Sequence, residues 1–131
     1  QLCRAIVNTF VAVAVGGALG AVSRYSFGLV ALALIGNRFP WATLGVNVVG
    51  SFLIGLAAVL IGDRIVDGEL WRPLIIVGFL GAFTTFSAFS LDTLLLLQQG
   101  NYNTALAYIL GSVTLCLGGT VSGMQLAKIF A

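Results

Sequence analysis

The hydrophobic pattern divides the chain into four long apolar segments joined by short polar turns. These segments run from about Ala5 to Ile35, from Ala42 to Ile61, from Leu74 to about Leu97 and from about Thr104 to Ile129. Each one reaches the roughly 20 residues that a helix needs to cross a bilayer, and none alternates as a barrel strand would. Since hydrocarbon offers no water to backbone amides, the pattern predicts an all-α membrane protein with four transmembrane helices in a single domain, residues 1–131.

The first segment is longer than a perpendicular span and carries Arg24 and Tyr25 in its interior. Because a cation and an aromatic ring are stable at the membrane interface, we expect a span from Ala5 to Ser23, followed by a shorter interfacial or bent piece. Two interpretations of Arg24 stay open: a side chain that snorkels to the interface, or an inward-facing charge with a functional or packing role.

The turns between the segments carry most of the charges and both tryptophans. GNRFPW precedes the second segment and QQGNYN precedes the fourth, and both are rich in turn residues. GDRIVDGELWRP lies between the second and third segments and holds all but one of the acidic residues, together with Arg64, Trp71 and Arg72. We expect this stretch to be the most aqueous loop.

The basic residues give only a weak signal for orientation in the membrane. If both termini lie on one side, that side receives Arg4, Arg64, Arg72 and Lys128, and the other receives Arg38 and Arg24. Loops rich in Lys and Arg stay in the cytoplasm, so a small excess is compatible with two alternatives. The chain has one orientation set by this excess, or it inserts in both orientations.

The composition excludes several classes of function. With 60% hydrophobic and 8% charged residues and a mean hydropathy of +1.11, the chain lies far from soluble domains, in which about a quarter of residues are charged. Its net charge of +2 comes from scattered residues and gives no footprint for nucleic acid. Histidine is absent and Cys3 and Cys116 are far apart, so neither a metal-ligand spacing nor a nucleophile–base pair exists and we expect no enzyme. Cys116 is interpreted as a small packing residue.

Small residues recur at helix-packing spacing in two segments. Gly16 and Gly20 lie one turn apart in the first segment, and Gly119 and Gly123 lie one turn apart in the fourth. This spacing lets the backbones of two membrane helices approach closely. Four short helices enclose little interior, so an aqueous pathway is easier to build between subunits, and we expect an oligomer.

The stretch GFLGAFTTFSAFS, residues 78–90, interrupts the third segment with small, hydroxylic and aromatic residues. Glycines 78 and 81, followed by Thr84 and Thr85, are poor helix formers and predict a break or an unwound turn. Carbonyls freed by such a break need a partner, for example an ion, and discontinuous helices are a common device of transporters and channels.

Beyond the predicted break, helical spacing puts Phe86 and Phe89 on one face and Ser87 and Ser90 on the neighbouring face. Two interpretations stay open: these side chains bond to their own helix and pack on neighbours, or they line a polar path. Asn47, near the middle of the second segment, leaves the same choice between a hydrogen bond that joins two helices and a position facing water.

These residues resemble the Fluc/CrcB family of small fluoride channels, and the likeness covers essentially the whole chain. It is carried by GFLGAFTTFSAFS, by GVNVVGSF around Asn47, by GGALGAVSRY around Arg24 and by AYILGS, which contains Tyr108 and Ser112. The resemblance implies a passive, fluoride-selective channel in the inner or plasma membrane of a microbe, where it exports fluoride from the cytoplasm and limits its toxicity. It also implies an antiparallel, dual-topology homodimer with two fluoride pathways and one central structural sodium ion.

The resemblance further assigns roles to individual residues. Along the fluoride pathway it implies Thr43, Asn47, Phe86, Ser87, Phe89, Asp92, Tyr108 and Ser112. It implies that the carbonyls of Gly81 and Thr84 hold the sodium ion and that Arg24 lies near the interface and the vestibule. The chain departs from the family at Ala88, where a hydroxyl is usual, and at Asp92, where a glutamate is often found, so we expect this polar track to differ in detail.

Two other functions compete with a channel. A small dual-topology cation or drug exporter would need an ionisable proton carrier within the membrane, for which Asp92 is the candidate. A non-conducting packing subunit is the interpretation if Asn47 and the hydroxyl groups only join helices. For each of these functions we expect the chain to contact membrane lipid and not nucleic acid.

Overall fold

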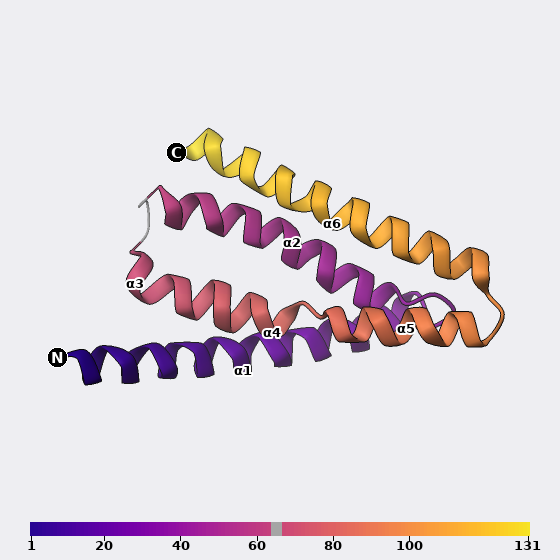
Figure 1. The fold of residues 1–131 in the computed structure, drawn as a ribbon, viewed down its shortest axis with the longest axis horizontal. Helices are drawn as coiled ribbons and strands as arrows, with labels where there is room; N and C mark the ends of the chain where they lie inside the picture. The colour runs from indigo at the N-terminus through magenta and orange to yellow at the C-terminus, as the bar shows by residue number, and fades with distance from the viewer. Residues whose placement is uncertain (64–66) are drawn as a thin grey trace.

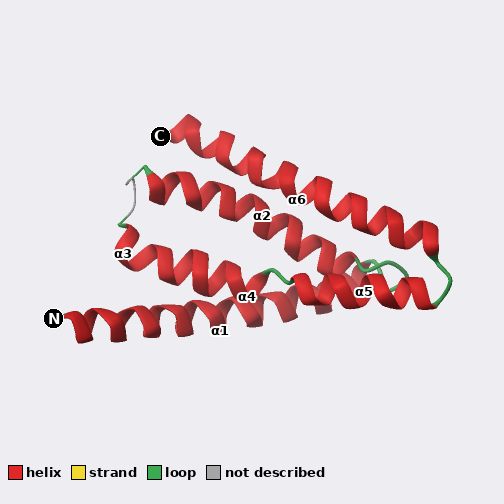
Figure 2. Cartoon of the chain, viewed as in Figure 1, coloured by secondary structure: helices red, strands yellow, loops and turns green. Residues whose placement is uncertain are grey.

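The computed structural model describes residues 1–63 and 67–131, and all regular structure in these ranges is helical (Figure 2). The helices are α1 (Leu2–Leu34), α2 (Trp41–Gly62), α3 (Gly68–Trp71), η1 (Arg72–Leu80), α4 (Gly81–Phe83), α5 (Phe86–Gln98) and α6 (Tyr102–Phe130). The segments α3 to α5 follow one another along a single span, so the described chain contains four helical spans long and apolar enough to cross a membrane. The predicted number and order of spans is confirmed.

The chain runs back and forth along the bundle, so that both termini lie at one end (Figure 1). This end, called the termini end, also receives the last turn of α2 and the first turn of α3, and the turns before α2 and α6 lie at the opposite, turn end. Arg4, Arg72 and Lys128 therefore lie towards the termini end and Arg38 at the turn end. The predicted aqueous position of Arg64 falls outside the described residues.

The first span differs from its prediction. α1 is one uninterrupted helix from Leu2 to Leu34, so the expected division after Ser23 is wrong. No proline stands near Arg24 to stop the helix, and its long aliphatic stem can lie along the helix surface. The helix ends at Leu34, and Gly36 follows it with a φ of +88°, a conformation that glycine adopts without a steric penalty.

The third span starts earlier than predicted, because the helix begins at Gly68 and not at Leu74. The Asp67 side chain caps it by accepting a hydrogen bond of 3.0 Å from the backbone N–H of Glu69. From Arg72 to Leu80 the helix widens to a π-helix with Pro73 near its start. Proline has no N–H to donate to a helical hydrogen bond, so the helix adopts a different pitch around Pro73.

The third span is interrupted at Thr84 and Thr85, where a break was predicted. Thr84 has a ψ of 157° and Thr85 a φ of −152°, both extended conformations, and α5 begins at Phe86. In Figure 2 the interruption is visible as a short loop between α4 and α5. Glycine and threonine are weak helix formers, so a contact from another helix suffices to hold this conformation.

The four spans pack as two close pairs, α1 with η1 and α4, and α2 with α6. A side chain added at Gly20 would overlap the backbone carbonyl of Phe79 in η1, and one added at Gly123 would overlap the carbonyl of Phe52 in α2. The predicted close approach at these glycines is therefore confirmed. It leaves α5 with a smaller contact, mainly to α6.

Candidate functional site

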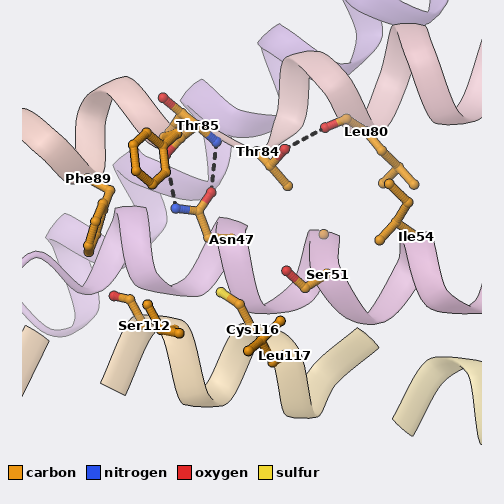
Figure 3. Close-up of a pocket in the computed structure, with 13 residues that line it drawn as sticks. Asn47, Ser51, Ile54, Leu80, Thr84, Thr85, Phe89, Ser112, Cys116 and Leu117 are labelled. Atoms are coloured by element: carbon orange, nitrogen blue, oxygen red, sulfur yellow. Dashed lines mark hydrogen bonds between the residues drawn. The ribbon is translucent and has the colours of Figure 1, made fainter. Parts of the chain in front are cut away.

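A groove of about 380 Å³ lies where α2, α6 and the interrupted third span meet (Figure 3). We call it the central groove. It is lined by Asn47, Gly50, Ser51 and Ile54 of α2, by Leu80, Thr84, Thr85, Phe86 and Phe89 of the third span, and by Ser112, Val113, Cys116 and Leu117 of α6. None of these residues is charged, so the groove combines neutral hydrogen-bonding groups with apolar walls.

Asn47 is held to the helix break by two hydrogen bonds. The backbone N–H of Thr85 donates to Oδ1 of Asn47 at 2.7 Å, and Nδ2 of Asn47 donates to the Thr85 carbonyl at 3.0 Å. This reciprocal pair settles which end of the carboxamide is oxygen, because a backbone N–H needs an acceptor. Nδ2 carries two hydrogens and the bond to Thr85 uses one, so a second donor is left for another acceptor.

The break leaves several backbone carbonyls without their helical donors, including those of Gly81 and Thr84. In a continuous helix the N–H of Thr85 would donate to the Gly81 carbonyl and the N–H of Ala88 to the Thr84 carbonyl. The first N–H is taken by Asn47, and the second donates to the Thr85 hydroxyl at 3.2 Å, which caps α5. Gly81 and Thr84 are the residues whose carbonyls were predicted to hold sodium.

The Thr84 side chain stays within its own span, since its hydroxyl donates to the Leu80 carbonyl at 2.9 Å. Its methyl group lies against Gly50, where an added side chain would overlap it. Because Gly50 has no side chain, the interrupted third span can pack closely against α2 at this point, one turn from Asn47.

Aromatic rings form a continuous row beside the groove. Phe86 and Phe89 have ring centroids 5.4 Å apart, and the Phe89 and Tyr108 centroids are 5.2 Å apart. Phe39 meets Tyr108 edge to face at 5.4 Å. Phe86 is 78% exposed in the single chain, whereas Tyr108 is 1% exposed. The row therefore runs from a surface ring to a fully buried one.

Ser112 lies on the α6 wall of the groove that Asn47 also lines, and it is only 6% exposed. Within the described part of the chain its hydroxyl oxygen has no hydrogen-bond partner. A buried hydroxyl without a partner is unfavourable, by about 1–3 kcal/mol, so a group that binds in the groove can be satisfied here.

Asp92 and Thr43 lie in a second pocket, of about 290 Å³, at the turn end. Its polar residues include Arg38, and Asp92 accepts a hydrogen bond of 3.2 Å from the Tyr108 hydroxyl. Tyr108 therefore connects this turn-end pocket with the aromatic row.

Arg24 and Ser87 line a third pocket, of about 670 Å³, between α1, α2 and α5. Thr43 and Thr85 also contribute to it, so the pocket lies on the other side of the helix break from Ser112. The Ser87 and Thr85 hydroxyls are 3.3 Å apart.

The structure thus gathers Asn47, Thr84, Phe86, Phe89 and Ser112 at one groove. It places Thr43 and Asp92 in the turn-end pocket and Arg24 and Ser87 in the third pocket, away from that groove. Tyr108 and Gly81 line none of the three pockets described here, although Tyr108 touches Phe89 and Asp92.

The sequence analysis did not identify three hydrogen-bonding residues of the groove as candidates. Thr85 pairs with Asn47 through its backbone, a contact that no side-chain pattern reveals. Ser51 and Cys116 also line the groove. The spacing of four residues from Asn47 and from Ser112 was the available signal, because such residues lie on one helical face.

Comparison with known proteins gives concordant results along the chain. The family model for CrcB-like protein, Camphor Resistance (CrcB), matches residues 11–124. A curated protein of Magnetococcus marinus named fluoride-specific ion channel FluC is 47% identical over 117 residues, covering 89% of this chain and 95% of the relative. Proteins of the same name are 49% identical over 123 residues in Hahella chejuensis, covering 94% and 97%, and 45% identical over 122 residues in Nitrobacter winogradskyi, covering 92% and 97%.

Proposed function

The chain belongs to the CrcB-like family, and from that premise we propose that it is a passive channel for fluoride. It is a multi-pass membrane protein with four candidate spans, and the family is one of ion channels and not of enzymes. The observation that supports the proposal most directly is the central groove. Asn47 and two phenylalanine rings line it together with the Ser112 hydroxyl, which has no hydrogen-bond partner in residues 1–63 and 67–131.

Fluoride is small and strongly hydrated, which makes dehydration the main obstacle. Moving an ion of carboxylate or ammonium size into a medium of low dielectric constant costs of order 20 kcal/mol in an idealised Born estimate. A hydrogen bond to a charged group returns only about 1.5–3 kcal/mol net, so several donors and retained water are needed along the path. Asn47 and Ser112 supply neutral donors along the groove.

The rings beside these donors favour an anion over a cation. A phenylalanine ring has a positive edge and a negative face, so Phe86 and Phe89 can present C–H edges to fluoride. No carboxylate lines the central groove. We propose that the donors and the ring edges, in a pore too narrow for chloride, give passive and dehydrating conduction of fluoride.

A second copy of the chain, in antiparallel orientation, completes the pathway. Phe86 is exposed at the rim and the groove opens at the surface of the single subunit, where polar groups would otherwise meet acyl chains. The weak charge difference between the termini end and the turn end is compatible with insertion in both orientations. Two copies related in this way form a dual-topology homodimer with two equivalent fluoride pathways.

The Gly81 and Thr84 carbonyls fit a structural sodium ion, because the break removes their helical donors. Sodium supplies a fixed positive charge and satisfies hard oxygen ligands when bound. Protein kept in N-methylglucamine salts is then expected to unfold at a lower temperature than protein in sodium salts. Equal unfolding temperatures would argue against a sodium site.

The direction of transport follows from the acid–base chemistry of fluoride. Neutral HF crosses membranes and dissociates in a less acidic cytoplasm, and the resulting fluoride leaves through the channel down its electrochemical gradient. In the inner or plasma membrane of a microbe, a channel of this kind limits fluoride toxicity.

The decisive experiment is ion efflux from liposomes that contain the purified protein. Liposomes loaded with fluoride are expected to release it rapidly, and liposomes loaded with chloride are expected to retain it. A monodisperse protein that releases no fluoride, or that releases both ions equally, would overturn the proposed selectivity.

A further inference from the structure

The polar residues of the central groove continue for one turn beyond the predicted fluoride pathway. α2 and α6 both run from the turn end to the termini end (Figure 1), so four-residue steps on the two helices advance in the same direction. Ser51 lies one turn beyond Asn47 on α2, and Cys116 lies one turn beyond Ser112 on α6. All four line the groove, and in Figure 3 Ser112 and Cys116 project from α6 into the space towards α2.

The Thr120 hydroxyl links the backbones of α2 and α6 at the end of this polar row. The Thr120 hydroxyl donates at 3.1 Å to the Ser51 carbonyl and lies at 3.1 Å from the Cys116 carbonyl. The two backbones are therefore within reach of one oxygen atom. The Thr120 hydroxyl is occupied by these carbonyls, so the row of free side-chain donors ends with Ser51 and Cys116.

A cysteine alone would not indicate a path, but Ser112 gives an independent sign. Its hydroxyl is buried and unpartnered among the described residues, and it lines the same groove one turn away. Cys116 is a free thiol and partly exposed. Beside it the wall consists of Ile54, Val113 and Leu117, which offer no hydrogen bonds.

We propose that the ion pathway continues from Asn47 and Ser112 to Ser51 and Cys116, and that the Cys116 thiol is a specificity-determining donor at this further level. The inference rests on the proposed function. A thiol is a weak donor, so it can contact a partly hydrated fluoride without holding it as a hydroxyl would. Cys116 is then part of the conducting wall and not a packing residue.

The chain offers a matched cysteine control for the test. Cys3 lies at the exposed start of α1, and Cys3→Ser leaves Cys116 as the single thiol. Methyl methanethiosulfonate caps a thiol as its sulfur attacks the reagent's divalent sulfur. A disulfide forms, methanesulfinate leaves with the electron pair, and the thiol proton passes to water.

Capping of Cys116 in the Cys3→Ser protein is expected to abolish most fluoride efflux from liposomes, with the modification verified by mass. The Cys3→Ser/Cys116→Ser protein is expected to conduct and to be insensitive to the reagent. Leu115→Cys in that cysteine-free background puts a thiol on an exposed face of α6, and the reagent is expected to leave its efflux unchanged.

Two replacements separate a donor from a space-filling group. Cys116→Ser keeps a donor but holds fluoride more firmly, so it is expected to conduct at a reduced rate. Cys116→Val, similar in size without a donor, is expected to slow efflux further, while both proteins remain monodisperse with the same thermal unfolding. Any one of three results would overturn the inference: full efflux after verified capping, failure of Cys116 to react, or full efflux from Cys116→Val. Absence of fluoride efflux from the untreated protein would instead contradict the proposed function itself.

Discussion

The two halves of the third span have similar hydrophobic composition but different surroundings. Before the break, η1 and α4 pack tightly on α1, and Gly78, Leu80 and Phe83 are buried. After the break, α5 has a mostly exposed surface that includes Phe86 and Leu91, and it is buried mainly at Thr93 and Leu96. The first half is held by close backbone contact with α1. The second half borders the groove and has an exposed face.

The break separates the first half, which packs on α1, from the second half, which borders the groove. Asn47 accepts the Thr85 N–H that a continuous helix would have bonded to Gly81, so α5 begins as a separate helix after the break. Changes before the break are therefore expected to affect folding, and changes after it to affect conduction.

The largest effect is expected where η1 touches α1. Gly20→Val would push a side chain into the Phe79 carbonyl, and overpacking of this kind costs about 1–3 kcal/mol or more because the backbone must move. We expect a large loss of monodisperse protein in detergent and a lower thermal unfolding temperature. Gly28→Val is the matched control, since an added side chain there meets no atom within 4 Å. Equal yields of the two variants would contradict the packing account.

The next largest effect is expected at the break. Asn47→Leu has similar volume but removes both hydrogen bonds to Thr85, each with a penalty of about 1–3 kcal/mol, so fluoride efflux should fall at least about tenfold. Asn47→Asp keeps an acceptor for the Thr85 N–H but loses the donor and adds a negative charge. We therefore expect Asn47→Asp to fold better than Asn47→Leu but to conduct poorly. Efflux at the original rate in both variants would exclude Asn47 from the pathway.

A smaller effect is expected from the rings on α5. Phe86→Ile and Phe89→Ile should each slow fluoride efflux, because isoleucine has no positive ring edge. Only Phe89→Ile should also lower thermal stability, by about 1 kcal/mol, since Phe89 contacts both Phe86 and Tyr108 whereas Phe86 is exposed. Unchanged efflux in liposomes for both variants would count against a ring-edge role.

The smallest effect is expected at the link to the turn-end pocket. Tyr108→Phe keeps the ring and removes one hydrogen bond to Asp92, which is worth about 1 kcal/mol, so efflux should change by no more than about fivefold. Tyr102→Phe, at an exposed position, is the control and should behave as the unaltered protein. A complete loss of efflux in Tyr108→Phe would show that the hydroxyl does more than hold Asp92.

The prediction of the fold succeeded where local chemistry was decisive. Long apolar runs specify spans, and Gly81, Thr84 and Thr85 weaken the helix at the place where it is interrupted. It failed at Arg24, which was expected to end a span, because a charged residue with a long stem is tolerated inside a helix. It also placed Trp71 and Arg72 in a loop, although the helix starts at Gly68. The charged residues in this stretch indicated a loop more strongly than Asp67 indicated a helix cap.

The sequence by itself therefore determined the four helical spans, the position of the break and the small residues that let helices touch, because each depends on neighbours along the chain. Only the tertiary structure decided that Asn47 pairs with the backbone of Thr85, that the Ser112 hydroxyl has no partner among the described residues, and that Ser51 and Cys116 line the same groove. The physical reason is that these contacts join helices distant in sequence, and their geometry depends on how α2, α6 and the third span pack together.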